Sequence, residues 1–393
     1  GEAVSGVPGP GLFPLPASPG VLRGLELAMA VVAAVPASLA LGWPVLTLVA
    51  EAVGRGGAEI SLRRLAAWLA RRTPGAVVLA IGLAFPPFLL GLALYGEAVL
   101  SAAAQMAWLW LAVIPLLFLG VGSSFWVALR RRGAEPSTLR PFLPDVVESY
   151  ILAFRRRGIE RAGAAVTVLC LVSLLGVGFV LVAHGVLVAR PDLWGPVAGI
   201  PDGWGLPLRD PQLLPRLLFA LLGALALSGF AVAWHGADRE AAGEAAYGRA
   251  ALRFGVVWFG AATALELLAA VWLVLSLPGP VGKAALAGGA GSLLWTALGA
   301  AVAAVTLAVV AAAAEEPRQY VLGAAVAVAV SLIAETAVRQ RIRDAALAGI
   351  PDIALRAGML QPGSMMLFIV VSVLGAGLVA YLLWATSGSR RAF

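Results

Sequence analysis

The residues best placed to do chemistry in this sequence are carboxylates inside long apolar stretches. Glu266 lies in "GAATALELLAAVWL", about eleven residues before the end of an apolar run, and so near the middle of a membrane-sized helix. Ala262, Thr263, Ala269 and Ala270 lie one turn away, and small residues of this kind pack against other helices. Because a carboxylate in hydrocarbon costs about 2.5–3.5 kcal/mol on insertion scales, Glu266 is predicted to point into the protein. It would then carry a proton, bond a quinone-like headgroup, or join helices as a neutral or paired side chain.

Three further acidic residues lie nearer the ends of apolar runs. Glu26 follows Arg23 by about one helical turn, and Glu335 precedes Arg339 by four residues. These spacings predict local ion pairs. Glu97 has no such neighbour. All three stay candidates, with Glu266, for a proton or quinone site.

The two histidines, His184 and His235, are candidates because haem in a helical bundle needs imidazole ligands. They fall at opposite ends of two apolar runs, so they are not expected to bind one haem together, although single ligation with a Met or a partner chain's residue is an alternative. Asp238 and Arg239 lie close to His235, which predicts a solvated side chain. His184 is kept as a proton or quinone candidate. The single cysteine, Cys170, excludes disulfides within the chain and CxxC motifs.

These side chains must be positioned by membrane helices. Of the 393 residues, 61% are hydrophobic and only 12% charged, and the mean hydropathy is +0.93. The expected fold is an all-α, polytopic transmembrane bundle of about nine spans. We predict them at 25–53, 75–99, 104–129, 163–189, 213–235, 249–277, 284–314, 318–338 and 364–387.

The distribution of basic residues predicts the topology. Most of the 28 basic residues fall in the loops after the odd-numbered spans and at the C-terminus, which places the N-terminus outside and the C-terminus in the cytoplasm. "AETAVRQRIRDAALAG" opposes this assignment, because it puts three arginines on the outer side. The net charge of +7 is accordingly interpreted as a topology signal, and nucleic acid is not expected as a partner.

The segments around the spans suggest further partners. "GEAVSGVPGPGLFPLPASPG" lacks a basic region typical of signal peptides. "ISLRRLAAWLARR" and "DVVESYILAFRRRGIERAG" are predicted to be amphipathic helices in the membrane interface, where arginines favour anionic lipids. No Walker, HExxH or Rossmann motif and no soluble domain is present. The predicted parts are an extramembrane arm at 1–22, the bundle at 23–388 and a tail at 389–393. Within the bundle, interfacial helices are predicted near 60–73 and 143–161. An outer loop is predicted at 190–212, where it caps the bundle or faces an extracytoplasmic partner.

One span has a more specific pattern. "LLPRLLFALLGALALSGFAVAWHG" begins with a proline and an arginine and continues as a helix rich in Ala and Gly. With "FPPFLLGLALYGE", "MAWLWLAVIPLLFLG" and "VRQRIRDAAL", it resembles quinol-oxidising respiratory membrane subunits of the cytochrome bd type and related b-type cytochromes. The resemblance implies a haem-ligating or quinol-site histidine just inside the "PR" pair, where this chain has Phe219. It therefore implies a haem-free paralogue beside a redox-active subunit.

Packing evidence in the same span is independent of that resemblance. Ala220, Ala224 and Ser228 recur every four residues beside Gly223, a small-residue face that admits a close neighbour.

Three hypotheses follow for the whole chain. The first is a subunit of a bacterial inner-membrane respiratory or electron-transfer complex, which is not catalytic alone. In this hypothesis the chain binds no cofactor of its own other than a quinone. Haem or iron–sulfur groups belong to partner membrane and extracytoplasmic subunits. The second is a proton-coupled secondary transporter using Glu266. The third is a membrane scaffold or assembly subunit.

Overall fold

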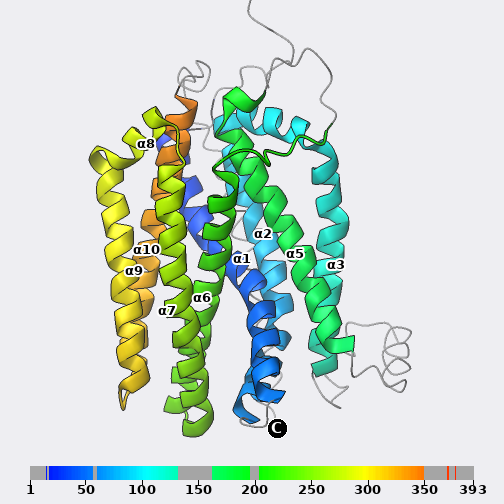
Figure 1. Cartoon of the computed structure of the whole chain (residues 1–393), viewed down its shortest axis with the longest axis vertical. Helices are drawn as coiled ribbons and strands as arrows, with labels where there is room; N and C mark the ends of the chain where they lie inside the picture. The colour runs from blue at the N-terminus through cyan, green and yellow to red at the C-terminus, as the bar shows by residue number, and fades with distance from the viewer. Residues whose placement is uncertain are drawn as a thin grey trace, which may run out of the picture.

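The computed structural model describes residues 15, 17–55, 60–131, 162–194 and 203–348, and the isolated positions 370 and 377. Within these residues the chain is almost entirely helical and has no extended strand (Figure 1). The helices are α1 (Pro19–Arg55), α2 (Ile60–Gln105), α3 (Ala107–Arg131), α5 (Ala162–Val188), α6 (Leu213–Ala241), α7 (Ala245–Leu275), α8 (Gly279–Leu286), α9 (Gly288–Ala313) and α10 (Pro317–Leu347), with a 3₁₀ turn, η3, at Pro191–Trp194.

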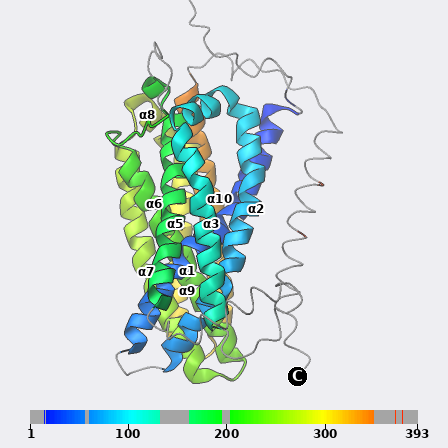
Figure 2. The ribbon, with the colours of Figure 1, turned by 90° about the vertical axis from the view of Figure 1, so that its right-hand side faces the viewer.

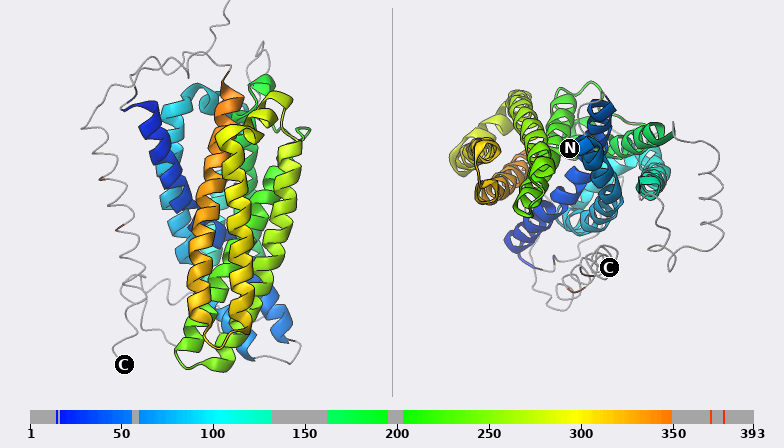
Figure 3. Two further views of the ribbon diagram at one scale, coloured as in Figure 1. Left: turned by 90° about the vertical axis from the view of Figure 1, so that its left-hand side faces the viewer. Right: turned by 90° about the horizontal axis from the view of Figure 1, so that it is seen from below.

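The long helices run roughly side by side and pack mainly in pairs. α1 packs on α2, α3 on α5, α6 on α7, and α9 on α10. Viewed along the bundle, α9 and α10 lie on one side and α3 and α5 on the other (Figure 3). Figure 2 shows α3 in front of this arrangement. The short helix α8 marks one end of the bundle, here called the α8 end, and the turn between α6 and α7 lies at the opposite end (Figure 1).

Eight of the described helices are long and apolar enough to cross a membrane. The predicted all-α, multi-pass bundle is therefore confirmed, and the first eight predicted spans each fall within or largely overlap a helix. The ninth predicted span, 364–387, lies outside the described residues apart from two positions. The predicted orientation would place the α8 end outside, and it stays a prediction.

Two predicted boundaries were wrong. The run 284–314 is divided between α8 and α9, because Ala287 adopts an extended conformation (φ −92°, ψ 150°). The span predicted at 318–338 continues as helix to Leu347, so the arginines assigned to a loop belong to α10. This extension proves central to the candidate site.

The basic segment 60–73 forms the start of α2 and is continuous with the rest of that helix. Leu65 and Leu69 are fully buried against the bundle and Trp68 is partly buried, while Arg63 and Arg64 are exposed. The segment is thus amphipathic as expected, and its place in a membrane interface stays a prediction. The other proposed interfacial helix, 143–161, and the tail 389–393 lie outside the described residues.

The small residues of α6 create the closest helix contacts. A Cβ added to Gly236 would lie 2.7 Å from the carbonyl oxygen of Gly248 on α7, and one added to Gly229 would lie 2.6 Å from the backbone nitrogen of Phe259. On another side of α6, the Ser228 hydroxyl donates to the Ser38 carbonyl of α1 at 3.2 Å. The predicted packing role of α6 is confirmed.

Only part of the predicted small-residue face takes part in these contacts. Ala224 and Ser228 are buried, and both lie against Gly42 of α1. Ala220 is exposed instead.

The described part of the 190–212 loop is held by ion pairs. Arg190 contacts Asp192 at 2.7 Å and Asp210 at 2.5 Å, and the Asp210 side chain is 1% exposed. Hydrogen bonds from Arg190 hold the pKa of the Asp192 carboxyl below its ordinary value. The loop also docks on the bundle, since the Gly205 amide donates to the Gln105 carbonyl at 2.8 Å.

Only the last residues of the predicted N-terminal arm are described. Leu15, Ala17 and Leu22 are buried in the same apolar cluster as parts of α2, α3 and α5. The arm was predicted to lie outside the membrane, and α1 starts within it, at Pro19.

Candidate functional site

Two carboxylates from different helices approach each other beside α6. Glu266 extends from α7 towards α6, where its Oε1 atom occupies the space that a side chain on Gly223 would fill. Glu335 comes from α10 and accepts a hydrogen bond from Ser331 at 3.0 Å. Glu266 lies within electrostatic range of both Glu335 and Arg339, and Arg339 lies over Phe219, one turn from Gly223 on α6. Two of the predicted site residues are therefore brought together.

Arg339 is the cation of this cluster. Its Nη2 atom lies 3.6 Å from Glu335, which confirms the predicted pair at that spacing. Its guanidinium also lies over the ring of Phe219 on α6, 5.3 Å from the centroid. About half of the Arg339 side chain is exposed. Phe219, at the position where the resemblance implied a histidine, thus contacts the guanidinium of Arg339 through the face of its ring.

The local pair predicted between Glu26 and Arg23 is wrong. Glu26 is 6% exposed and bonds to Arg343 of α10 at 2.6 Å, with Gln340 donating to the same carboxylate oxygen at 3.1 Å. Arg23 pairs with Asp344, also of α10, at 3.6 Å. The physical reason is the extension of α10, which offers partners to α1 across a sequence separation of more than 300 residues.

Two residues that sequence reasoning missed complete this second cluster. Tyr95 is 1% exposed and donates a 2.5 Å hydrogen bond to Asp344, while Arg343 lies 4.3 Å from the centre of its ring. Tyr95 also departs from helical geometry (φ −127°, ψ 31°), so α2 kinks at this residue. The kink occurs where an aromatic hydroxyl meets an ion-pair network.

One face of α10 organises both clusters. Ser331, Glu335, Arg339 and Arg343 recur every four residues, a spacing that stacks side chains along one side of a helix. We call this set the polar stripe of α10. Its contacts pass from Glu335 and Glu266 to Glu26, Tyr95 and Asp344 near the α8 end. The four-residue repeat of polar types was the signal in the sequence that could have revealed it.

The remaining acidic candidate, Glu97, is in α2 two residues after Tyr95. Its side chain lies outside the described part of the structure. Its candidacy stays a prediction.

His235 is buried, and the prediction that it is solvated was wrong. Its ring stacks on Trp68 at a centroid distance of 3.9 Å, and its Nε2 atom is 3.1 Å from the Tyr247 hydroxyl. The reason is that α2 begins over this end of α6 and covers the ring. Arg64 lies 4.2 Å from the Tyr247 ring centre, so the site is an aromatic cluster closed by a cation.

His184 lies elsewhere, on α5. It is 8% exposed, its ring meets Trp110 edge-on at 5.1 Å, and its Nδ1 atom has no hydrogen-bond partner among the described residues. The two histidines therefore contact different residues, and their surroundings do not fit haem ligation by a facing pair. In the described ranges no group of three or more His, Cys, Asp or Glu side chains could hold a metal ion.

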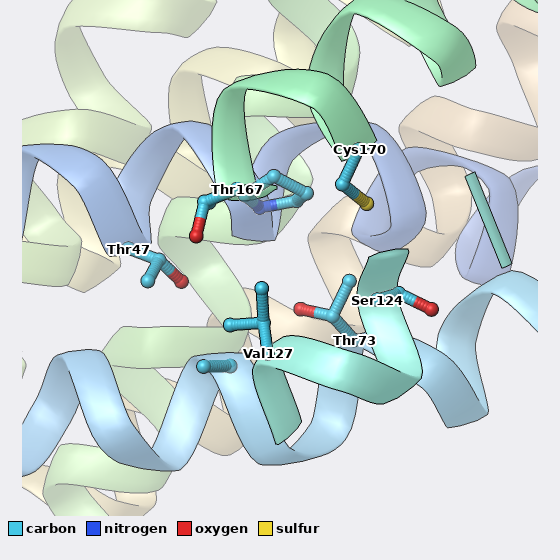
Figure 4. A pocket seen from close by; sticks show the side chains of 8 residues that line it. Thr47, Thr73, Ser124, Val127, Thr167 and Cys170 are labelled. Carbon is cyan, nitrogen blue, oxygen red and sulfur yellow. The ribbon is translucent and has the colours of Figure 1, made fainter. Parts of the chain in front are cut away.

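A small cavity lies between α1, α2, α3 and α5, away from the carboxylates (Figure 4). It offers about 10 Å³, on the order of the space for one water molecule. The hydroxyls of Thr47, Thr73, Ser124 and Thr167 each donate to a carbonyl of their own helix at 2.7–2.9 Å. Because these donors are used within the helices, the cavity has little to orient a ligand.

Comparison with known proteins places the fold but not a family. No family model matches the chain, and no curated protein matches it. A solved structure, described as that of bd oxidase from Geobacillus thermodenitrificans, has a similar fold, with a TM-score of 0.67 and 13% sequence identity over 95% of this chain and 99% of that chain. The predicted resemblance to the cytochrome bd type is confirmed at the level of the fold.

Proposed function

We propose that this chain is a membrane subunit of a respiratory or electron-transfer complex of the bacterial cytoplasmic membrane. It binds no haem itself and packs beside a redox-active subunit. The observation that carries the proposal is the likeness of fold to a bd oxidase chain over nearly the whole length of both chains. Fold alone does not determine function, so the site must supply the rest of the argument.

The site supports a role without haem in three ways. Phe219 occupies the place of the implied ligand and contacts Arg339, and phenylalanine cannot coordinate iron. His235 is enclosed by Trp68 and Tyr247. His184 has no second histidine beside it. In this role Glu266 and Glu335 would line a proton or quinone site next to the partner.

Purification from native membranes tests this function. The complex is extracted in a mild detergent, its chains are identified by mass spectrometry, and a reduced-minus-oxidised spectrum is recorded for the complex and for this chain expressed alone. We expect cytochrome or iron–sulfur subunits to co-purify, and the isolated chain to give no haem bands. Haem retained by the isolated chain, or the absence of any redox subunit, contradicts the proposal.

A proton-coupled transporter is the second candidate. It is favoured by the electrostatic proximity of Glu266 to Glu335, because two carboxylates beside an arginine inside a membrane span are typical of proton-coupling sites. Reconstitution of the chain alone in liposomes distinguishes the two functions. Solute uptake driven by a pH gradient, abolished in Glu266→Gln but kept in the exposed control Glu315→Gln, would replace the first proposal with the second.

A further inference from the structure

We propose that Glu266 and Glu335 hold one exchangeable proton between them, and that this proton enters from the α8 end along the polar stripe of α10. The inference applies equally to a subunit of a complex and to a chain that works alone. It concerns what the α7–α10 carboxylates bind and how the proton reaches them.

Charge balance at the cluster favours one proton. Glu266 faces Gly223 of α6, which carries no charge, and α10 contributes Glu335 and Arg339, of which Arg339 lies over the uncharged ring of Phe219. Arg216, one turn before Phe219, is a further cation, but the carboxylate that acts on it is Asp210, and it is not among the charges that act on Glu266 or Glu335. Two ionised carboxylates beside Arg339 would leave a net negative charge in the membrane, whereas one bound proton makes the group neutral.

Buried polar atoms without partners indicate water next to Glu266 and further along the stripe. Thr263 lies one turn before Glu266 on α7, is 6% exposed, and its hydroxyl has no hydrogen-bond partner among the described residues. The Nε atoms of Arg216 and Arg343 are likewise buried and unpaired within the described ranges. Buried polar groups of this kind are normally satisfied by ordered water. Water here would connect the carboxyl pair to its neighbours.

The polar stripe provides the route. Successive members of the stripe are four residues apart, which is about 6 Å along a helix and within reach of one bridging water. Glu335 pairs with Arg339, and the next member of the stripe, Arg343, bonds Glu26 and lies against the ring of Tyr95. Tyr95 in turn bonds Asp344. Asp344 is 22% exposed and Arg23 beside it is 40% exposed, so the network opens at the α8 end.

The groups along the route suit a proton better than a metal ion. An excess proton and Na⁺ carry the same positive charge, which Glu335 and Glu26 offset beside Arg339 and Arg343. A proton is passed between hydroxyls, carboxyls and water, whereas a metal ion needs a shell of several oxygen ligands. The carboxylates of the route are instead bonded to arginines.

Infrared spectroscopy of the full chain in lipid nanodiscs tests proton occupancy directly. At neutral pH we expect a carboxylic-acid C=O band that shifts in D₂O, because one of the two carboxyls is protonated. Glu266→Gln and Glu335→Gln should each remove it, since the remaining carboxylate then pairs with Arg339 in its ionised form. Glu315→Gln, at the exposed opposite end of α10, should keep it. Absence of the band in the unmodified chain, or its persistence in both site variants, overturns the proposal.

The route is tested by the rate at which that band exchanges on transfer to D₂O. Tyr95→Phe removes the hydroxyl that bonds Asp344 but keeps the ring under Arg343, so the fold is expected to survive. Exchange should slow several-fold in Tyr95→Phe and in Asp344→Asn. Exchange at the unmodified rate in Tyr95→Phe overturns the route. Both measurements use the isolated chain, so they can contradict the proton proposal while co-purifying redox subunits still support the proposed function. Conversely, the proton band can be present when no redox subunit co-purifies.

Discussion

The ion pair between Glu26 and Arg343 gives the most quantitative test of how α10 is held in the bundle. The replacement Arg343→Met removes the cation 2.6 Å from a carboxylate that is 6% exposed, and only the amide of Gln340 remains to bond it. Breaking a buried pair in this way costs about 3–5 kcal/mol, because an uncompensated charge stays behind. We expect Arg343→Met to lower the free energy of unfolding by an amount in that range.

A double-mutant cycle separates the pair from the packing around it. Glu26→Gln, Arg343→Met and the double variant are each unfolded by SDS in mixed micelles and followed by tryptophan fluorescence. The double variant carries no unpaired charge, so it should recover much of the loss seen in Arg343→Met. We expect a coupling energy of about 2 kcal/mol or more, within the range for residues in direct contact.

The exposed pair between Arg318 and Asp238 is the control. Its atoms are 3.7 Å apart and its side chains are 67% and 48% exposed, so Arg318→Met should change stability little. If the effects of Glu26→Gln and Arg343→Met are additive to within about 0.5 kcal/mol, the two residues are not coupled and our account of α10 is incorrect.

Three further outcomes are expected. Gly236→Ala should destabilise the α6–α7 pair by about 1–3 kcal/mol, because the new methyl group meets backbone atoms, whereas Gly260→Ala, with a side-chain atom at 3.7 Å, should be tolerated in the same unfolding assay. Arg190→Gln should lower the free energy of unfolding by about 3 kcal/mol, because it leaves the buried Asp210 carboxylate without its cation. Proteases should then cleave the 190–212 loop faster, and an unchanged cleavage rate would contradict this. The Asp192 carboxyl has a lower pKa in the folded chain than its ordinary value of about 4, so its ionised form stabilises the fold above that value. This stability is lost as the pH falls through the lowered pKa. Asp192→Asn should therefore reduce the free energy of unfolding slightly at neutral pH and not at all in strong acid.

The spans were predictable because their signal is local. A run of about 20 apolar residues predicts a membrane helix without knowledge of its neighbours, and eight described helices meet that criterion. The division at Ala287 was missed because a run of Ala and Gly stays apolar through a break. Nothing in its composition marks one extended residue.

The partners of charged side chains were less predictable. Glu335 and Arg339 are four residues apart on one helix, and the spacing rule found them. Glu26 and Arg343 are 317 positions apart, and their contact depends on where α10 ends and how it crosses α1. His235 shows the same limit, because its cover comes from α2 and not from its own loop.

The polar stripe also constrains how the protein is made. The part of α10 from Glu335 to Asp344 carries five ionisable side chains, and on insertion scales each costs about 2.5–3.5 kcal/mol at the centre of a lone helix. Their partners, Glu26, Tyr95 and Glu266, belong to helices synthesised earlier. We therefore expect α10 to enter the membrane stably only after α1, α2 and α7 are in place. Biogenesis should then proceed in chain order, and a chain from which α1 has been deleted should fail at its last helices.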